Sequence, residues 1–239
     1  MPELRELSPL RESLWVSADV TLAVAAIAAA LPDKWHTTLV GFVFLAATWA
    51  LVWRKDDARV RHSGLALGGL VMPGRLDVRA LLRDVAVACA WGFGMLALVG
   101  VPFYFGWRAW FAHFMPRLSF SLEVHPGEAT NEVLGQLFVI ALPEEAFYRG
   151  YLQSRLDDAW TPRWRILGAT LGPGWLLASG IFAAGHVATV HAVTRLAVFF
   201  PALLFGWLRA RTRGIGAPVV CHMLFNVYSQ VLGRGYGVY

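Results

Sequence analysis

Long apolar runs separated by short polar segments dominate the chain. A helix needs about 20 mostly apolar residues to cross the hydrocarbon core of a bilayer. Seven segments come close to that length, at 14–31, 37–53, 84–105, 131–152, 168–190, 191–208 and 215–232. The pattern therefore predicts an all-α fold, a polytopic membrane helical bundle with about seven transmembrane helices.

The distribution of basic residues predicts the orientation of this bundle. Cytoplasmic loops of membrane proteins carry an excess of Lys and Arg. With a cytoplasmic N-terminus, the segments on the inner side hold 16 of the 21 Lys and Arg residues. We therefore expect the N-terminus inside. An amphipathic stretch near 75–83 is then expected at the inner interface, and 106–130 forms the longest outer loop.

Composition supports a membrane protein and excludes several other classes. Hydrophobic residues make up 57% of the chain and charged residues only 15%, whereas about a quarter of a soluble domain is charged. The net charge is +5, but the basic residues lie in short segments between apolar runs, which argues against a nucleic-acid partner. Arg outnumbers Lys 19 to 2, which favours a GC-rich bacterial genome. We expect an integral protein of a bacterial inner membrane, in contact with the lipid bilayer.

The first polar cluster within these runs consists of Glu144, Glu145 and Arg149. An ionisable side chain inside a span costs about 2.5–3.5 kcal/mol even on lenient insertion scales, so its presence points to function. Glu145 and Arg149 are four residues apart and share one helix face, where they are expected to pair. Glu144 then faces a different neighbour, and Pro143 is expected to kink the helix just before it.

Two further clusters lie in later spans. His186 is surrounded by small residues, which allow close approach of a neighbouring helix. His222 and Asn226 are four residues apart and therefore project from one face of their helix. Two hydrogen-bonding side chains in a water-poor site are suited to stabilising an oxyanion.

Taken together, these clusters resemble the signature motifs of a known family. The motifs are Glu-Glu-x-x-x-Arg at 144–149, Phe-x-x-x-His at 182–186 and His-x-x-x-Asn at 222–226, with Tyr-Leu following Arg149-Gly150. In this order and on separate spans, they resemble the CAAX-protease and bacteriocin-processing family of intramembrane endopeptidases. The resemblance covers about 131–232, whereas the first 130 residues contain no matching motif.

The resemblance implies a function and roles for individual residues. Glu144 and His186 would activate a water for attack on a peptide carbonyl, His222 and Asn226 would stabilise the oxyanion, and Glu145 would hold Arg149. The substrate would be a membrane-anchored protein or peptide, such as one with a C-terminal sorting signal or a leader peptide. Residues 1–130 would form N-terminal membrane helices, with the interfacial segment and the outer loop, and 131–239 a catalytic core of four helices.

Metal dependence is a separate question, because the family is also labelled metalloprotease. If the reaction required zinc, Glu144, His186 and His222 would be the admissible ligands. The sequence has no His-Glu-x-x-His helix and no dense Cys/His cluster. We therefore favour a metal-free glutamic mechanism and expect no cofactor.

Two other classes of function use similar residues. Membrane carboxylates and histidines also serve as proton relays in transporters, although no inverted repeat is visible in the sequence. A non-catalytic immunity or scaffold protein could share the same fold. Loss of substrate processing on mutation of Glu144 or His186 would separate a protease from both.

Overall fold

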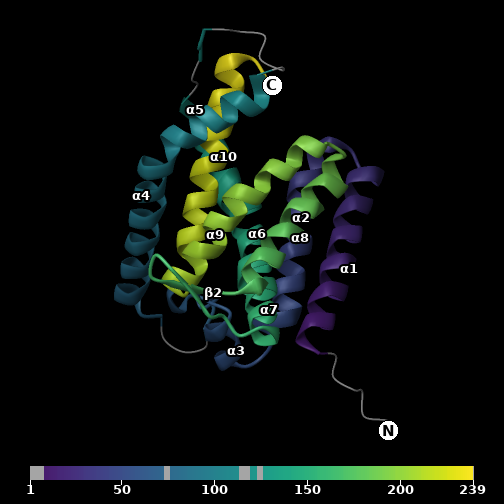
Figure 1. Ribbon diagram of the computed structural model, residues 1–239, viewed down its shortest axis with the longest axis vertical. Helices are drawn as coiled ribbons and strands as arrows, with labels where there is room; N and C mark the ends of the chain where they lie inside the picture. The colour runs from purple at the N-terminus through teal and green to yellow at the C-terminus, as the bar shows by residue number, and fades with distance from the viewer. Residues whose placement is uncertain (1–7, 73–75, 113–118, 123–125, 239) are drawn as a thin grey trace.

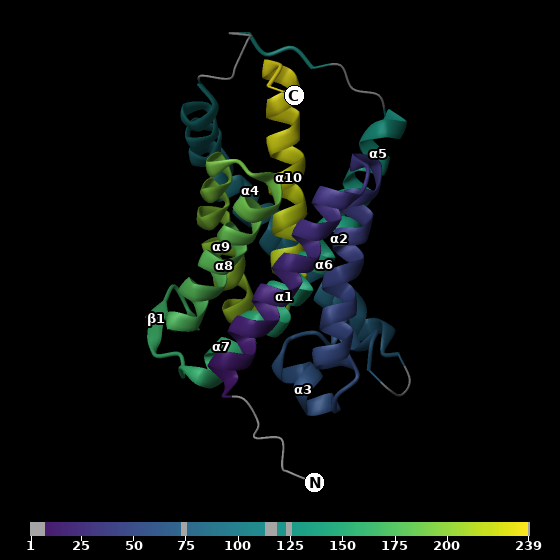
Figure 2. The same ribbon diagram turned by 90° about the vertical axis from the view of Figure 1, so that its right-hand side faces the viewer.

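The fold is a bundle of long helices, shown as a computed structural model in Figures 1 and 2. The structure describes residues 8–72, 76–112, 119–122 and 126–238, and it is 82% helical. The helices before the motifs are α1 (Pro9–Ala30), α2 (Asp33–Thr48), η1 (Trp49–Trp53), α3 (Asp57–His62), η2 (Leu67–Gly69) and α4 (Val78–Phe111). The elements that follow are α5 (Pro126–Gly135), η4 (Gln136–Ala141), α6 (Leu142–Glu145), η5 (Ala146–Gln153), α7 (Ser154–Ala159), β1 (Trp164–Ile166), β2 (Ala169–Leu171), α8 (Pro173–Val190), η6 (Val193–Val198), α9 (Phe199–Thr212) and α10 (Gly216–Tyr236).

The expected helical membrane bundle is present. Within the described residues, five helical segments are long and apolar enough to cross a membrane: Pro9–Ala30, Lys34–Trp53, Val78–Phe111, Pro173–Val190 and Val193–Thr212. Their outer faces are strongly apolar, as on α4, where Phe93, Leu98 and Phe105 are 57–70% exposed. Exposed apolar surface on this scale would be unfavourable in water and is stable in lipid. The other two predicted spans coincide with the helical run from α5 to α7 and with α10, which carry the polar motifs.

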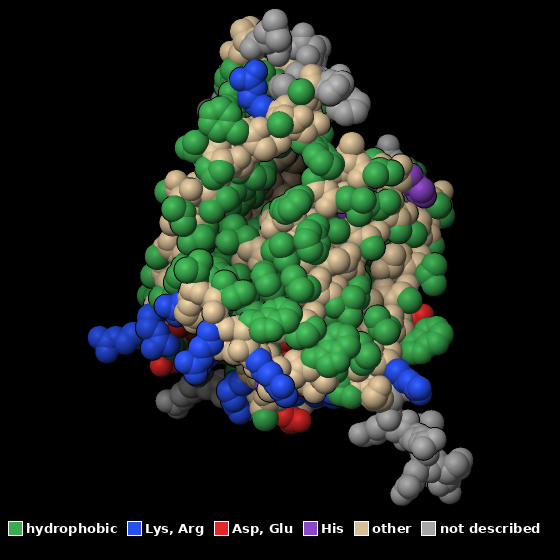
Figure 3. All heavy atoms as spheres, viewed as in Figure 1, with side chains coloured by type: hydrophobic (Ala, Val, Ile, Leu, Met, Phe, Trp, Pro, Cys, Tyr) green, Lys and Arg blue, Asp and Glu red, His purple; other side chains and the backbone are tan. Residues whose placement is uncertain are grey.

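Charged side chains gather at one end of the bundle. In Figure 3 most of the visible Lys and Arg side chains lie along the lower edge, below a broad hydrophobic surface. The N-terminal end of α1, together with α3, α7 and the β1–β2 hairpin, lies at this end in Figures 1 and 2, and the C-terminus lies at the other. The start of α1 thus lies at the basic end of the bundle, and a cytoplasmic N-terminus remains the prediction of the positive-inside rule.

Two segment boundaries differ from the sequence-based expectation. Residues 164–171 form an antiparallel hairpin, and α8 begins only at Pro173, so the span expected at 168–190 starts five residues later. The hairpin turn is Leu167-Gly168, and both residues have positive φ angles, as a tight two-residue turn requires. The interfacial segment near 75–83 is not a separate helix, because from Val78 onward it forms the first turns of α4. Arg75 lies outside the described residues, as do 113–118 and 123–125 of the expected outer loop, whose two ends belong to α4 and α5.

The helix that carries the two glutamates is wound unusually on both sides of them. Wide π-helical turns, η4 and η5, flank the single α-helical turn of α6, and such turns are frequent at functional sites. Pro143 has no N–H, so the Val139 carbonyl loses the partner that residue 143 would normally supply. A Cβ built on Gly41 of α2 would lie only 2.5 Å from that oxygen. The absence of a side chain at Gly41 thus allows α2 to approach the helix close to Pro143.

A partly buried carboxyl group, that of Asp157, lies at the charged end, just after the fourth predicted span. Burial raises the pKa of Asp157 to about 7, against an opposing effect of the Arg209 charge. The folded protein therefore holds this proton more tightly than the unfolded chain, and the free energy of unfolding should fall as the pH rises from about 4 to about 7. We expect Asp157→Asn to weaken this pH dependence and to be more stable than the wild type at pH 8.

Denaturation midpoints of the purified protein at pH 5 and pH 8 measure this effect. Asp158→Asn is the matched control, because Asp158 binds Arg59 and His62 at 2.9 and 2.8 Å and its loss should lower stability at pH 8. Equal pH dependence in wild type and Asp157→Asn would contradict the prediction.

Candidate active site

Three segments bring the polar residues of the motifs together in the middle of the bundle. The helical run η4–α6–η5 supplies Glu144, Glu145 and Arg149, helix α8 supplies His186, and α10 supplies His222 and Asn226. α10 packs against η4 and α6, and α8 packs against η5. The structure shows which of these residues meet and which do not.

Glu145 is the centre of a buried hydrogen-bond network. Its Oε1 atom accepts hydrogen bonds from Arg149 Nη1 at 3.0 Å and from His222 Nδ1 at 2.8 Å. Arg149 also donates through Nη2 to the Ala202 carbonyl of α9 at 3.2 Å. The expected Glu145–Arg149 ion pair is therefore present, with both side chains at most 2% exposed. The carboxylate also holds the His222 ring, a contact that the spacing alone did not reveal.

Aromatic rings enclose this network. The Arg149 guanidinium lies 4.5 Å from the centre of the Phe182 ring and 5.4 Å from that of Phe205. His222 stacks on Phe205 at 4.7 Å between ring centres. The rings exclude water from the ion pair while their faces attract the cation. Phe205 was not identified from the sequence, because an aromatic residue in an apolar span carries no distinguishing signal.

Glu144 takes no part in the hydrogen bonds of this network, but its carboxylate approaches His222 from the other side. Its Oε2 atom lies 3.9 Å from His222 Nε2. The same oxygen is buried and has no hydrogen-bond partner among the described protein atoms. A buried carboxylate oxygen without a partner is costly, so this atom is suited to binding a water or a substrate group.

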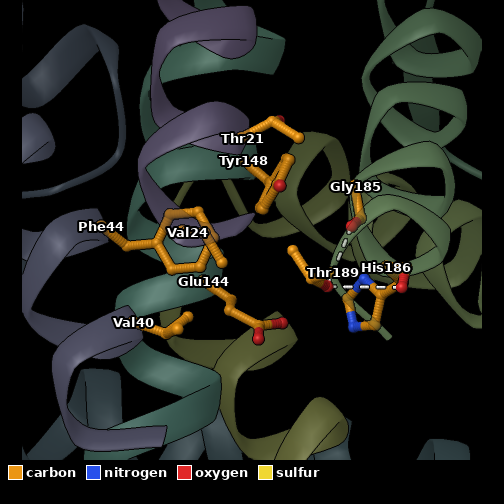
Figure 4. Close-up of a pocket in the computed structure, with 9 residues that line it drawn as sticks. All are labelled: Thr21, Val24, Val40, Phe44, Glu144, Tyr148, Gly185, His186 and Thr189. Atoms are coloured by element: carbon orange, nitrogen blue, oxygen red, sulfur yellow. Dashed lines mark hydrogen bonds between the residues drawn. The ribbon is translucent and has the colours of Figure 1, made fainter. Parts of the chain in front are cut away.

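Glu144 and His186 line one small pocket. The pocket has a volume of about 50 Å³, and Figure 4 shows the Glu144 carboxylate and the His186 ring on opposite sides of it. His186 donates through Nδ1 to the Phe182 carbonyl at 3.0 Å, and its ring lies 4.4 Å from the Phe182 ring. The backbone bond fixes the ring orientation and leaves Nε2 for the pocket. Both residues therefore lie at the depth of one cavity, as water activation requires.

Asn226 occupies a separate position. Its side-chain nitrogen donates to Gln136 Oε1 at 2.8 Å, and neither Asn226 nor His222 lines the pocket between Glu144 and His186. An amide nitrogen has two N–H groups, so this bond leaves one donor. Gln136 is a buried polar residue that was not singled out from the sequence, although a Gln at the start of an apolar run is a usable signal.

The remaining wall of the pocket comes from the first two helices. Thr21 and Val24 of α1 and Val40 and Phe44 of α2 complete the lining, with Tyr148, Gly185 and Thr189. The four residues from α1 and α2 belong to no recognisable motif. Their position depends on how α1 and α2 pack against the core, which the sequence pattern does not encode.

The alternative zinc ligand set is not assembled. Within the part of the chain that the structure describes, no three His, Cys, Asp or Glu side chains are grouped closely enough to hold a metal ion. Glu144 and His222 approach each other, while His186 lies across the pocket (Figure 4). The donor set formed by Glu144, His186 and His222 therefore does not fit a zinc centre in this arrangement.

Comparison with known proteins identifies the same region. Residues 127–228 match a family model described as Type II CAAX prenyl endopeptidase Rce1-like. Among curated proteins and solved structures, no match to the chain is found. The matched segment includes all three motifs and all six residues discussed above. Residues 127–228 of this integral membrane protein thus match an Rce1-like domain of the CAAX-protease and bacteriocin-processing family, as the motifs indicated.

Proposed function

We propose that the protein is an intramembrane endopeptidase that hydrolyses a peptide bond in a membrane-anchored substrate. Glu144 and His186 would activate the attacking water. Two observations carry the proposal: Glu144 and His186 line one pocket, and one oxygen of the Glu144 carboxylate is buried without a hydrogen-bond partner among the described protein atoms. Such an oxygen is available to accept a proton from a water bound between the two side chains.

In this mechanism Glu144 is the general base. The carboxylate accepts a proton from the bound water as the water oxygen attacks the scissile carbonyl. His186 accepts a second hydrogen bond from the same water through Nε2, because its Nδ1 is committed to the Phe182 carbonyl. The proton held on Glu144 then passes to the leaving amine, which completes the hydrolysis.

The oxyanion formed in this step would be stabilised from α10. Asn226 has one amide N–H beyond the bond to Gln136. His222 donates through Nε2 when the ring carries both protons, since Nδ1–H is held by Glu145. Glu145 and Arg149 are positioning residues in this scheme, because they orient His222 and contact no reacting atom. No metal ion is required, and we propose the glutamic type for this reason.

The catalytic core would comprise 131–239, and 1–130 would contribute the further membrane helices. The printed description of the matched family refers to prenyl endopeptidases. For a bacterial inner-membrane protein, a C-terminal sorting signal or a leader peptide is the substrate class we propose. In both cases the substrate enters the bundle from the bilayer.

The test compares membrane proteins of a gene-deletion strain that carries either the wild-type gene or His186→Ala. We expect one or more membrane proteins to keep an extra terminal segment with His186→Ala, detected by mass spectrometry of terminal peptides. Identical termini in the two strains would reject the proposed function. Loss of processing by purified protein in 1,10-phenanthroline, restored by zinc, would reject the metal-free mechanism alone.

A further inference from the structure

The pocket beside Glu144 and His186 is closed by helices outside the matched family region. Four of its nine lining residues belong to α1 and α2 (Figure 4), whereas the family model begins at residue 127. Val24, Val40 and Phe44 present only carbon atoms to the pocket from their side chains. An apolar wall facing two catalytic groups is suited to a substrate side chain rather than to a charged group.

The volume of the pocket limits what it can hold. At about 50 Å³ it can hold a water, which needs a cavity of about 10–15 Å³, but it is only about a third of the roughly 150 Å³ of a cavity that binds benzene. Once the reacting water is bound between Glu144 and His186, space remains for a very small side chain. A Leu or Phe side chain would require the wall to move.

The wall is held in place by contacts behind it. Val24 is 5% exposed and belongs to the main hydrophobic core. The Phe44 ring lies 5.4 Å from both the Phe147 ring and the Tyr148 ring. Gly41 places α2 directly against the Val139 carbonyl. Because protein interiors are close-packed, such a wall does not yield to an extra methylene without cost.

We propose that α1 and α2 form the subsite for a substrate residue next to the scissile bond, and that Val24 and Val40 restrict this residue to Gly, Ala or Ser. The inference rests on the proposed function and adds the class of bond that is cut. It also assigns a role to the N-terminal helices, which carry no motif. Helices α1 and α2 would select the substrate, and the matched region would supply the chemistry.

The test uses purified protein in lipid vesicles and a synthetic library of apolar single-span peptides that differ in the residues near the centre. Mass spectrometry identifies each cut and the residue on either side of it. We expect peptides with Ala on one side of the cut to be cleaved at least about 10-fold faster than peptides with Leu there. One methylene in a tight pocket changes the specificity of cleavage by about 10- to 200-fold. Val24→Ala and, independently, Val40→Ala should reduce that preference by about 10-fold.

Val20→Ala is the matched control. Val20 lies one turn before Val24 on α1 and is also buried, but it does not line the pocket. It should keep the wild-type preference. An unchanged Ala-to-Leu ratio in both Val24→Ala and Val40→Ala, or a change of the same size in Val20→Ala, would overturn the inference while leaving the protease assignment intact. Absence of any cut by wild-type protein would instead reject the proposed function, and the subsite with it.

Discussion

Glu144→Gln is expected to lower the rate of substrate processing by about 10²- to 10⁴-fold, the range typical of removing a general base. The substitution keeps the size of the side chain and replaces a proton-accepting carboxylate by an amide. Since one oxygen of Glu144 is buried without a partner, loss of the charge should leave the free energy of unfolding unchanged or raise it. The combination of lost activity and retained stability distinguishes a catalytic carboxylate from a structural one. Initial cleavage rates and denaturation midpoints of the purified variants provide both measurements.

Glu132→Gln is the control for this prediction. Glu132 lies on α5, in the same helical run, and forms an ion pair with Arg234 at 2.6 Å near the surface. Its replacement should change the cleavage rate by less than about 3-fold, because the side chain does not line the pocket. Processing by Glu144→Gln at the wild-type rate would show that another group activates the water.

Arg149→Met is expected to lower the free energy of unfolding by about 3–5 kcal/mol, the usual cost of breaking a buried ion pair by removing one partner. The Glu145 side chain is fully buried, so its carboxylate would lose the guanidinium with no water to replace it. The Ala202 carbonyl would lose a donor at the same time. Unfolding of the protein in mixed micelles with increasing SDS measures the change.

Two further variants test the cause of this loss. Glu145→Gln combined with Arg149→Met removes both charges, and it should be less destabilised than the sum of the two single variants. Arg59→Met removes a partly exposed ion pair with Asp158 and should cost only about 1 kcal/mol or less. A loss in Arg149→Met no larger than that in Arg59→Met would contradict a buried, water-free ion pair.

Local periodicity was sufficient to predict the helices and one of the contacts. The pairing of Glu145 with Arg149 follows from their spacing, because residues four apart on a helix are neighbours whatever surrounds them. The same reasoning placed Glu144 on another face of the helix. Apolar runs of about 20 residues predicted the membrane helices, since no other open structure satisfies its backbone hydrogen bonds in lipid. The prediction of where α8 starts was less accurate, since the helix begins at Pro173 and not at 168. The hairpin at 164–171 that precedes it depends on a tight turn with two positive φ angles.

Contacts between segments distant in the chain could not be predicted from local periodicity. The bond from His222 to Glu145 spans 77 positions and that from Asn226 to Gln136 spans 90. Both depend on the rotation of α10 against η4 and α6, which no local pattern specifies. The approach of α1 and α2 to the pocket likewise depends on packing at Gly41 and Phe44. The sequence by itself determined the membrane helices and the chemical groups they carry, because helix geometry and burial in lipid act locally. Only the tertiary structure decided which groups face one another and how small the space between them is, because close packing is a property of several helices at once.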